Sequence, residues 1–149
     1  MSVPLDWVDR IRAAVEVMLD AIDGVAFAFI CLGPEFESAC VIASSADAVE
    51  LHQVELELGD GPSITAFRTA RLARTMSRSH LDEWPAYTVA RQQHGIYSVA
   101  AFPITGDGRC LGVLSIASSD HYGFGPVELR LGRALAADVA LLVLANDSM

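Results

Sequence analysis

The sequence predicts one α+β domain over residues 1–149, an antiparallel β-sheet with a helix at each end of the chain. Apolar residues near both ends recur at three- and four-residue spacing, which is typical of amphipathic helices. Two pairs of short apolar runs lie between them, each pair joined by a glycine-containing turn, which is typical of antiparallel hairpins. With 52% hydrophobic residues the chain can bury a full core as a single domain.

The first part of the chain is predicted to form a helix and a hairpin. Residues 4–22 follow the helical repeat, and Asp23-Gly24 supplies the stop signal. The runs at 25–32 and 38–43 are short, partly β-branched and separated by Gly33-Pro34-Glu35, which favours strands over helices. We therefore expect two antiparallel strands directly after the first helix.

The middle of the chain is predicted to be mainly helical. Residues 46–54 have the pattern of a short helix, and Pro62 after the break at 59–61 suits the start of a helix over 63–69. Beyond it we expect a short strand at 72–76, a turn-rich loop at 80–85 and a helix at 86–93, listed here in chain order.

The last part carries the clearest strand signal. Residues 96–105 and 110–118 are joined by Gly106-Asp107-Gly108-Arg109, whose glycines suit a tight turn. Gly125-Pro126 then begins a helix towards Asn146. From Leu135 onward this helix is apolar almost all round, so more than one surface must cover it. We expect a homodimer through the terminal helices, with Leu135 and Leu142 in the interface; the alternative is burial in the same subunit.

The charge and cysteine content exclude several classes of protein. A net charge of −9 argues against direct binding to nucleic acid or to an anionic membrane surface. No signal peptide is recognisable, and the apolar run at 139–145 is too short to span a bilayer, so we expect a cytoplasmic protein. Cys31, Cys40 and Cys110 lie in apolar runs without metal-ligand spacing, and we expect reduced thiols.

The best local candidate for ligand binding is the corner Gly59-Asp60-Gly61-Pro62-Ser63. A helix that begins at such a corner leaves amide N–H groups without internal partners, and these can hold a polar or anionic group. We therefore name Asp60 and Ser63 as ligand-binding candidates. The alternative, of equal weight, is that Asp60 or water caps the amides and the corner is only a turn.

Four aromatic residues are candidates for the lining of the same cavity, because ligand pockets combine aromatic walls with a few polar groups. They are Phe67, Trp84, Tyr87 and Tyr97, and the alternative is that they are ordinary core residues. The four histidines are dispersed, with no metal-ligand spacing. We predict no metal, no cofactor and no catalytic residues.

Several segments together resemble the GAF domain family, over nearly the whole chain. They are Leu56–Pro62, Trp84-Pro85 with Gly95–Ile104, Cys110–Ile116 and Phe124–Leu129. The resemblance implies a GAF/PAS-like sheet, with the terminal helices on one face and a small-molecule pocket enclosed by short helices and loops on the other. The sequence looks most like actinobacterial GAF domains that occur with an RNA-binding ANTAR module, although we expect the protein to be without that module.

The resemblance implies a stand-alone regulatory or sensor domain that binds an unknown small molecule. It would signal through a helical dimer interface, with a downstream regulatory protein as a possible partner. The alternatives are an interaction module with a collapsed pocket and a haem or redox sensor. The cysteines do not match free methionine sulfoxide reductase, a GAF-type enzyme, because Ser63 follows Gly-Asp-Gly-Pro here. The absence of lysine excludes the Asn-Lys-Phe-Asp-Glu signature of cyclic-nucleotide-binding members.

Overall fold

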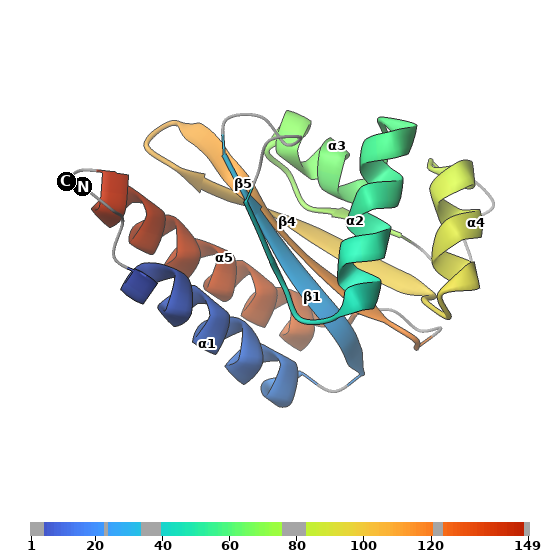
Figure 1. Ribbon diagram of the computed structural model, residues 1–149, viewed down its shortest axis with the longest axis horizontal. Helices are drawn as coiled ribbons and strands as arrows, with labels where there is room; N and C mark the ends of the chain where they lie inside the picture. Colours follow the sequence, from blue (N-terminus) through green and yellow to red (C-terminus); the bar gives the residue numbers. More distant parts are fainter. Residues whose placement is uncertain (1–4, 23, 34–39, 76–82, 121–123, 148–149) are drawn as a thin grey trace.

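The computed structural model describes residues 5–22, 24–33, 40–75, 83–120 and 124–147. Five helices and five strands alternate irregularly along these residues (Figure 1). In chain order they are α1 (Leu5–Ala21), β1 (Val25–Leu32), β2 (Cys40–Ala43), α2 (Ala46–Leu58), α3 (Pro62–Thr69), β3 (Ala73–Arg74), α4 (Pro85–Gln93), β4 (Ser98–Gly106), β5 (Arg109–Ser118) and α5 (Pro126–Asp147).

The strands form one antiparallel sheet in the order β2-β1-β5-β4-β3. The β4–β5 hairpin turns at Asp107 and Gly108, which both have positive φ, and Gly106 pairs with Arg109 across it. Strand β1 pairs with β5 from Val25 to Leu32, so the centre of the sheet joins the two predicted hairpins. The predicted α+β fold with an antiparallel sheet is confirmed.

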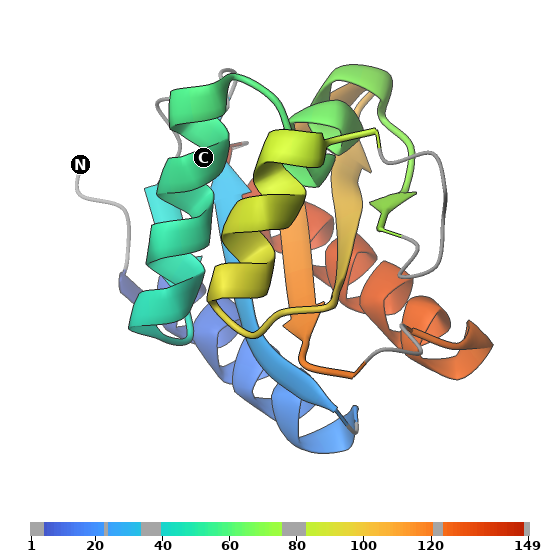
Figure 2. The same ribbon diagram turned by 90° about the vertical axis from the view of Figure 1, so that its right-hand side faces the viewer.

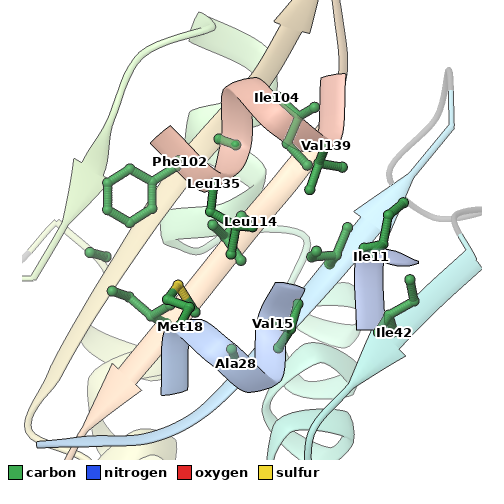
Figure 3. Close-up of a cluster of buried hydrophobic side chains, with 14 of the residues drawn as sticks. Ile11, Val15, Met18, Ala28, Ile42, Phe102, Ile104, Leu114, Leu135 and Val139 are labelled. Atoms are coloured by element: carbon green, nitrogen blue, oxygen red, sulfur yellow. The ribbon is translucent and has the colours of Figure 1, made fainter. Parts of the chain in front are cut away.

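Helices α1 and α5 lie side by side across one face of the sheet (Figures 1 and 2). Each turns an apolar stripe inward, as the helical spacing predicted. Figure 3 shows this layer, which contains Ile11 and Val15 of α1, Val139 of α5, and Leu114 and Phe102 of the sheet. The terminal helices therefore share a core with the central strands.

Helices α2, α3 and α4 cover the opposite face (Figure 2). Side chains alternate along β5, so that Leu114 belongs to the layer under α1 and α5 while Val113 belongs to the layer under α2, α3 and α4. The second layer contains most of the buried aromatic side chains, among them Phe27, Phe29, Trp84 and Tyr87. One sheet thus separates two apolar layers, as the family resemblance implied.

Some boundaries differ from the sequence prediction. Helix α2 continues past Val54 to Leu58, because it ends only at Gly59, which adopts the left-handed conformation. Its start is capped by the side chain of Ser45. Strand β3 is limited to two residues, and α4 begins at Pro85, which was expected in a loop. Residues 38–39 and 76–82, which carry parts of the predicted strands and loop, lie outside the described residues. Within the described ranges no helix is long and apolar enough to span a membrane.

The two leucines assigned to a dimer interface contact the core of their own subunit. Leu135 is only 8% exposed and lies in the layer under α1 and α5, and Leu142 is half-buried against the same layer. The outer side of α5 instead exposes Val127, Leu131 and Leu141. The assignment of Leu135 and Leu142 to a dimer interface is therefore wrong, because their own subunit covers these side chains. The dimer itself stays a prediction.

Candidate functional site

The corner at residues 59–63 joins α2 to α3, and its amides are held by acidic side chains. The Gly61 N–H donates to Asp60 Oδ1 at 2.9 Å, and the Ser63 N–H donates to Glu55 Oε1 at 3.1 Å. Asp60 itself is exposed. The alternative in which Asp60 caps the free amides therefore holds for the amide of Gly61. The amide of Ser63 donates instead to Glu55, which was not among the predicted residues.

Glu55 is the most unusual residue of this region. Its side chain is 1% exposed, between α2 and the start of α3. Burial raises the pKa of Glu55 to about 8, the hydrogen bond from Ser63 opposes this, and the charge of Asp60 adds to it. The oxygen Oε2 has no hydrogen-bond partner among the described residues. A buried polar atom without a partner is rare in proteins.

A pair of serines ties the same corner to the middle of the sheet. The hydroxyl groups of Ser63, at the start of α3, and Ser115, in β5, are hydrogen-bonded to one another, and both side chains are buried. Ser115 pairs with Phe29 and with Ala101 in the neighbouring strands, so it lies at the centre of the sheet. A polar path therefore leads from Glu55 through Ser63 to β5.

Helix α4 contributes two further buried polar groups, Tyr87 and Arg91. Burial raises the pKa of Tyr87 well above its ordinary value, the charge of Glu55 raises it further, and Arg91 lowers it. Arg91 Nη1 donates to the carbonyl groups of Ile96 and Tyr97 at 3.1 and 3.0 Å, which fixes the end of α4 to the start of β4. An acid, a phenol and a guanidinium thus share this side of the sheet.

The structure brings most of the predicted aromatic residues to this layer. Trp84 and Tyr87 lie inside it, and Phe67 packs against it partly buried. Trp84 Nε1 donates to Thr65 Oγ1 at 3.2 Å, which links α4 to α3. Tyr97 is half-buried, and its backbone forms two hydrogen bonds here. Its carbonyl group accepts from Arg91, and its N–H donates to the carbonyl group of Ser118. Asp60 lies outside, at the surface.

His52 and Cys31 form a second buried polar contact beneath α2. The Cys31 Sγ lies 3.5 Å from His52 Nδ1, and the His52 ring lies 5.2 Å from the Phe29 ring. Burial lowers the pKa of His52, so the imidazole is neutral at pH 7. Burial also raises the pKa of the Cys110 thiol, which disfavours the reactive thiolate. The side chain of Cys40 lies outside the described residues.

One group of side chains in the described ranges could meet around a metal ion: Asp47, Glu50 and His94. His94 Nδ1 lies 3.2 Å from Asp47 Oδ1 and 3.5 Å from Glu50 Oε2, so the three side chains already contact one another between α2 and the end of α4. Both acids are exposed, and such groups are common at surfaces without a metal. The prediction of no metal stays a prediction.

Sequence reasoning missed Glu55, Ser115 and Arg91. A signal existed for Glu55, because it falls on the inner face of α2 together with Ala48 and Leu51, at helical spacing. No comparable signal existed for Ser115, since small polar residues are common in strands, and only the fold brings it to Ser63. Chemically, the arrangement offers a carboxyl group, hydroxyl groups and a phenol inside an apolar layer, which suits binding of a small polar group.

A sheet with its terminal helices on one face and a buried polar cluster under short helices on the other defines the protein as an α+β domain built on one antiparallel sheet. The sequence matches the model of the GAF domain over residues 5–143, and the chain belongs to the GAF domain family. Members of this family are generally regulatory rather than catalytic, and the fold is known for binding small molecules. No curated protein matches the sequence.

Similar solved structures agree with this assignment. They include the GAF domain region of a Geobacter sulfurreducens PCA protein (22% identity, TM-score 0.70) and a type II free methionine-R-sulfoxide reductase from Thermoplasma acidophilum (14%, 0.68). A third is the photoproduct state of GAF3 from Slr1393 of Synechocystis sp. PCC6803 (14%, 0.64). Each alignment covers 95% of both chains. At these identities the similarity shows the fold alone, and the finer resemblance to ANTAR-associated domains stays a prediction.

Proposed function

We propose that this GAF domain is a sensor that binds a small molecule between the sheet and helices α2, α3 and α4, with Glu55 as the main polar contact. The observation that carries the proposal is the buried oxygen Glu55 Oε2, which lacks a partner among the described residues. Oε2 is an acceptor when Glu55 is ionised and a donor when Glu55 is protonated, because Oε1 already accepts from the Ser63 N–H. An ammonium group would pair with the carboxylate, and the carbonyl oxygen of an amide would pair with the neutral acid, and either would remove the penalty of an unpaired buried group.

The protonation state of Glu55 refines the choice of ligand. Because burial raises its pKa to about 8, the carboxyl group is mostly neutral at pH 7. An ammonium group would favour the carboxylate and release the proton on binding, whereas an amide would bind the group without that release. Binding of an amine is therefore expected to strengthen as the pH rises from 6 to 8.5.

The terminal helices are the proposed output. Neighbouring residues of β5 face opposite layers, so Ser115 contacts the α3 side while Leu114 contacts the layer under α1 and α5. A ligand that shifts the Ser63–Ser115 contact would thereby alter the packing under α5. It can do so only if it binds one arrangement more tightly than the other. A homodimer through the exposed sides of α1 and α5 would pass this change to a downstream regulatory protein.

Native mass spectrometry of gently purified protein, followed by thermal unfolding with free amino acids and biogenic amines, tests the proposal. We expect at least one amine to raise the melting temperature of the natural protein and of Glu57→Gln, but not of Glu55→Gln. Glu57 is the matched control, because it carries the same charge on the same helix and is exposed. Equal stabilisation of both variants would refute the role of Glu55.

Burial of Trp84 and Tyr87 in the same layer favours a second candidate, an interaction module whose pocket is filled by its own side chains. This candidate predicts no retained small molecule and no thermal shift with any amine or amide, while a protein partner still binds. A haem or redox sensor is a third candidate, for which buried His52 beside Cys31 is the relevant contact. A visible absorption spectrum of the fresh protein decides on haem.

A further inference from the structure

A groove of about 400 Å³ lies between the segment after α3, strand β4 and helix α5. Its walls are the end of α3 with the following segment, the outer edge of β4 and one side of α5. Phe102 and Leu72 form apolar parts of the wall, and both pack in the layer under α1 and α5. This volume is within the range of small-molecule sites.

The groove exists because β3 is short. Strand β3 pairs only with Ala100 and Ala101 of β4, through Arg74 and Ala73. Strand β4 continues to Gly106, so within the described residues no strand covers its outer edge beyond Ala101. The edge is interrupted by Pro103, which lacks an N–H and disfavours pairing with a further strand.

Two arginines, Arg71 and Arg133, line this groove in a protein with a net charge of −9. Neither has an ion pair or hydrogen bond with any part of the chain that the structure describes. Among the described residues that line the groove, none is acidic. Arg74 pairs in register with Ala100, which belongs to the layer under α5, so a third guanidinium is directed to the same face.

We propose that the groove binds an organic anion with an apolar body, a second ligand site distinct from the one at Glu55. Arg71 and Arg133 would hold a carboxylate or phosphate head group, since guanidinium groups bind such oxyanions through paired hydrogen bonds. The apolar body would lie on Leu72 and Ala137, over the buried ring of Phe102. An overall acidic surface would repel the same anion elsewhere, which directs it to this groove.

A ligand in the groove would act directly on α5, because Arg133, Ala136 and Ala137 belong to that helix. The contact between α5 and β4 is close at this level, since a Cβ atom added at Gly132 would lie 2.3 Å from Phe102 Cζ. An anion that links Arg71 to Arg133 therefore ties α5 to the segment before β3. This input would reach α5 without passing through the Ser63–Ser115 contact.

The test uses hexyl phosphate and hexanoate as probes, with hexanol as the uncharged control, in calorimetric and ¹⁵N NMR titrations. We expect saturable binding of at least one anion and shifts of the amide signals of Thr105, Ala136 and Ala137. Arg71→Gln and Arg133→Gln are each expected to weaken binding about tenfold or more. Arg12→Gln, which removes the same charge from α1, should leave binding unchanged.

The probes also separate the sources of affinity. A preference for hexyl phosphate assigns the site to phosphorylated ligands, and a preference for hexanoate assigns it to carboxylates. Binding of hexanol with equal strength, shifts confined to α2 and α4, or no saturation at millimolar concentration would overturn the proposal. The two arginines are exposed, so unchanged melting temperatures of the variants confirm that a loss of binding is local.

Discussion

Gly61 has no side chain where the carboxyl group of Glu55 lies. A Cβ atom built on Gly61 would be 2.4 Å from Glu55 Oε1 and 2.7 Å from its Cδ. The backbone of Gly61 also has φ +154°, which residues with a side chain rarely adopt. The buried acid of α2 and the corner before α3 are therefore built around one another, and several consequences can be measured.

The variant Gly61→Ala is expected to lose stability because its methyl group displaces Glu55. Overpacking of a buried site typically costs about 1–3 kcal/mol, in addition to the backbone strain at this φ. Gly59→Ala is the matched control, since Gly59 has φ +68° but a Cβ atom there would have no neighbour within 4 Å. Urea unfolding should show the larger loss for Gly61→Ala. Equal losses in the two variants would mean that only backbone strain matters.

The stability of the protein is expected to fall as the pH rises from about 4.5 to about 8, through Glu55. The folded state holds this proton with a pKa of about 8, above the ordinary value of 4.5, so the folded state binds more protons in this window. The free energy of unfolding therefore decreases by up to about 1.4 kcal/mol for each unit that the pH rises, and the decrease ends above pH 8.

Glu55→Gln removes this titration while keeping an acceptor for the Ser63 N–H. The stability difference between Glu55→Gln and the natural protein should thus become more favourable to the variant from pH 5 to pH 8.5. Urea unfolding at four pH values measures it, with Glu57→Gln as the control that should keep the natural slope. Parallel profiles for all three proteins would show that Glu55 titrates in its ordinary range.

Gly132→Ala is expected to destabilise the protein, although alanine is normally the better helix former by about 1 kcal/mol. The added methyl group would lie 2.3 Å from Phe102 Cζ and would push α5 away from β4. The double variant with Phe102→Leu should recover part of the loss, because the smaller side chain clears the contact. A gain in stability for Gly132→Ala alone, measured by thermal unfolding, would contradict this close packing.

The fold was predictable because its signals are local. Strand β1 has the bounds expected from its apolar run, and the β4–β5 hairpin follows from two apolar runs around a glycine turn. The length of α2 was not predictable from its apolar pattern alone, since Glu55 interrupts the inner face before Leu58. The burial of Glu55 depends on Gly61, which leaves space for its carboxyl group, and on Ser63, which donates to it. Both residues contact Glu55 only because the chain changes its direction between α2 and α3.

The candidate site was predictable only in part, for the same reason. Ser63, Trp84 and Tyr87 were named from local cues, and the fold brings them into one layer. The bond between Ser63 and Ser115 spans 52 positions, and no sequence period connects two such residues. Asp60 is exposed because its carboxylate bonds the adjacent amide of Gly61, a turn contact that leaves it outside.

The homodimer proposal is now best tested at Leu141, which is 68% exposed on α5, rather than at Leu135. Val127 and Leu131 are further large apolar side chains exposed on α5, where Arg130 and Asp138 are exposed as well, and burial of the three apolar side chains in a dimer would be favourable.

Leu141→Glu is expected to yield monomers in sedimentation velocity, because a charge there cannot be buried in the interface. The subunit should stay folded, since Leu141 is exposed in it. Val89→Glu, at a 58% exposed position on α4, should leave the mass of the assembly unchanged. Leu135→Glu should unfold the subunit, since this side chain lies in its own core. A dimer that persists in Leu141→Glu would place the interface elsewhere, and a monomeric natural protein would end the proposal.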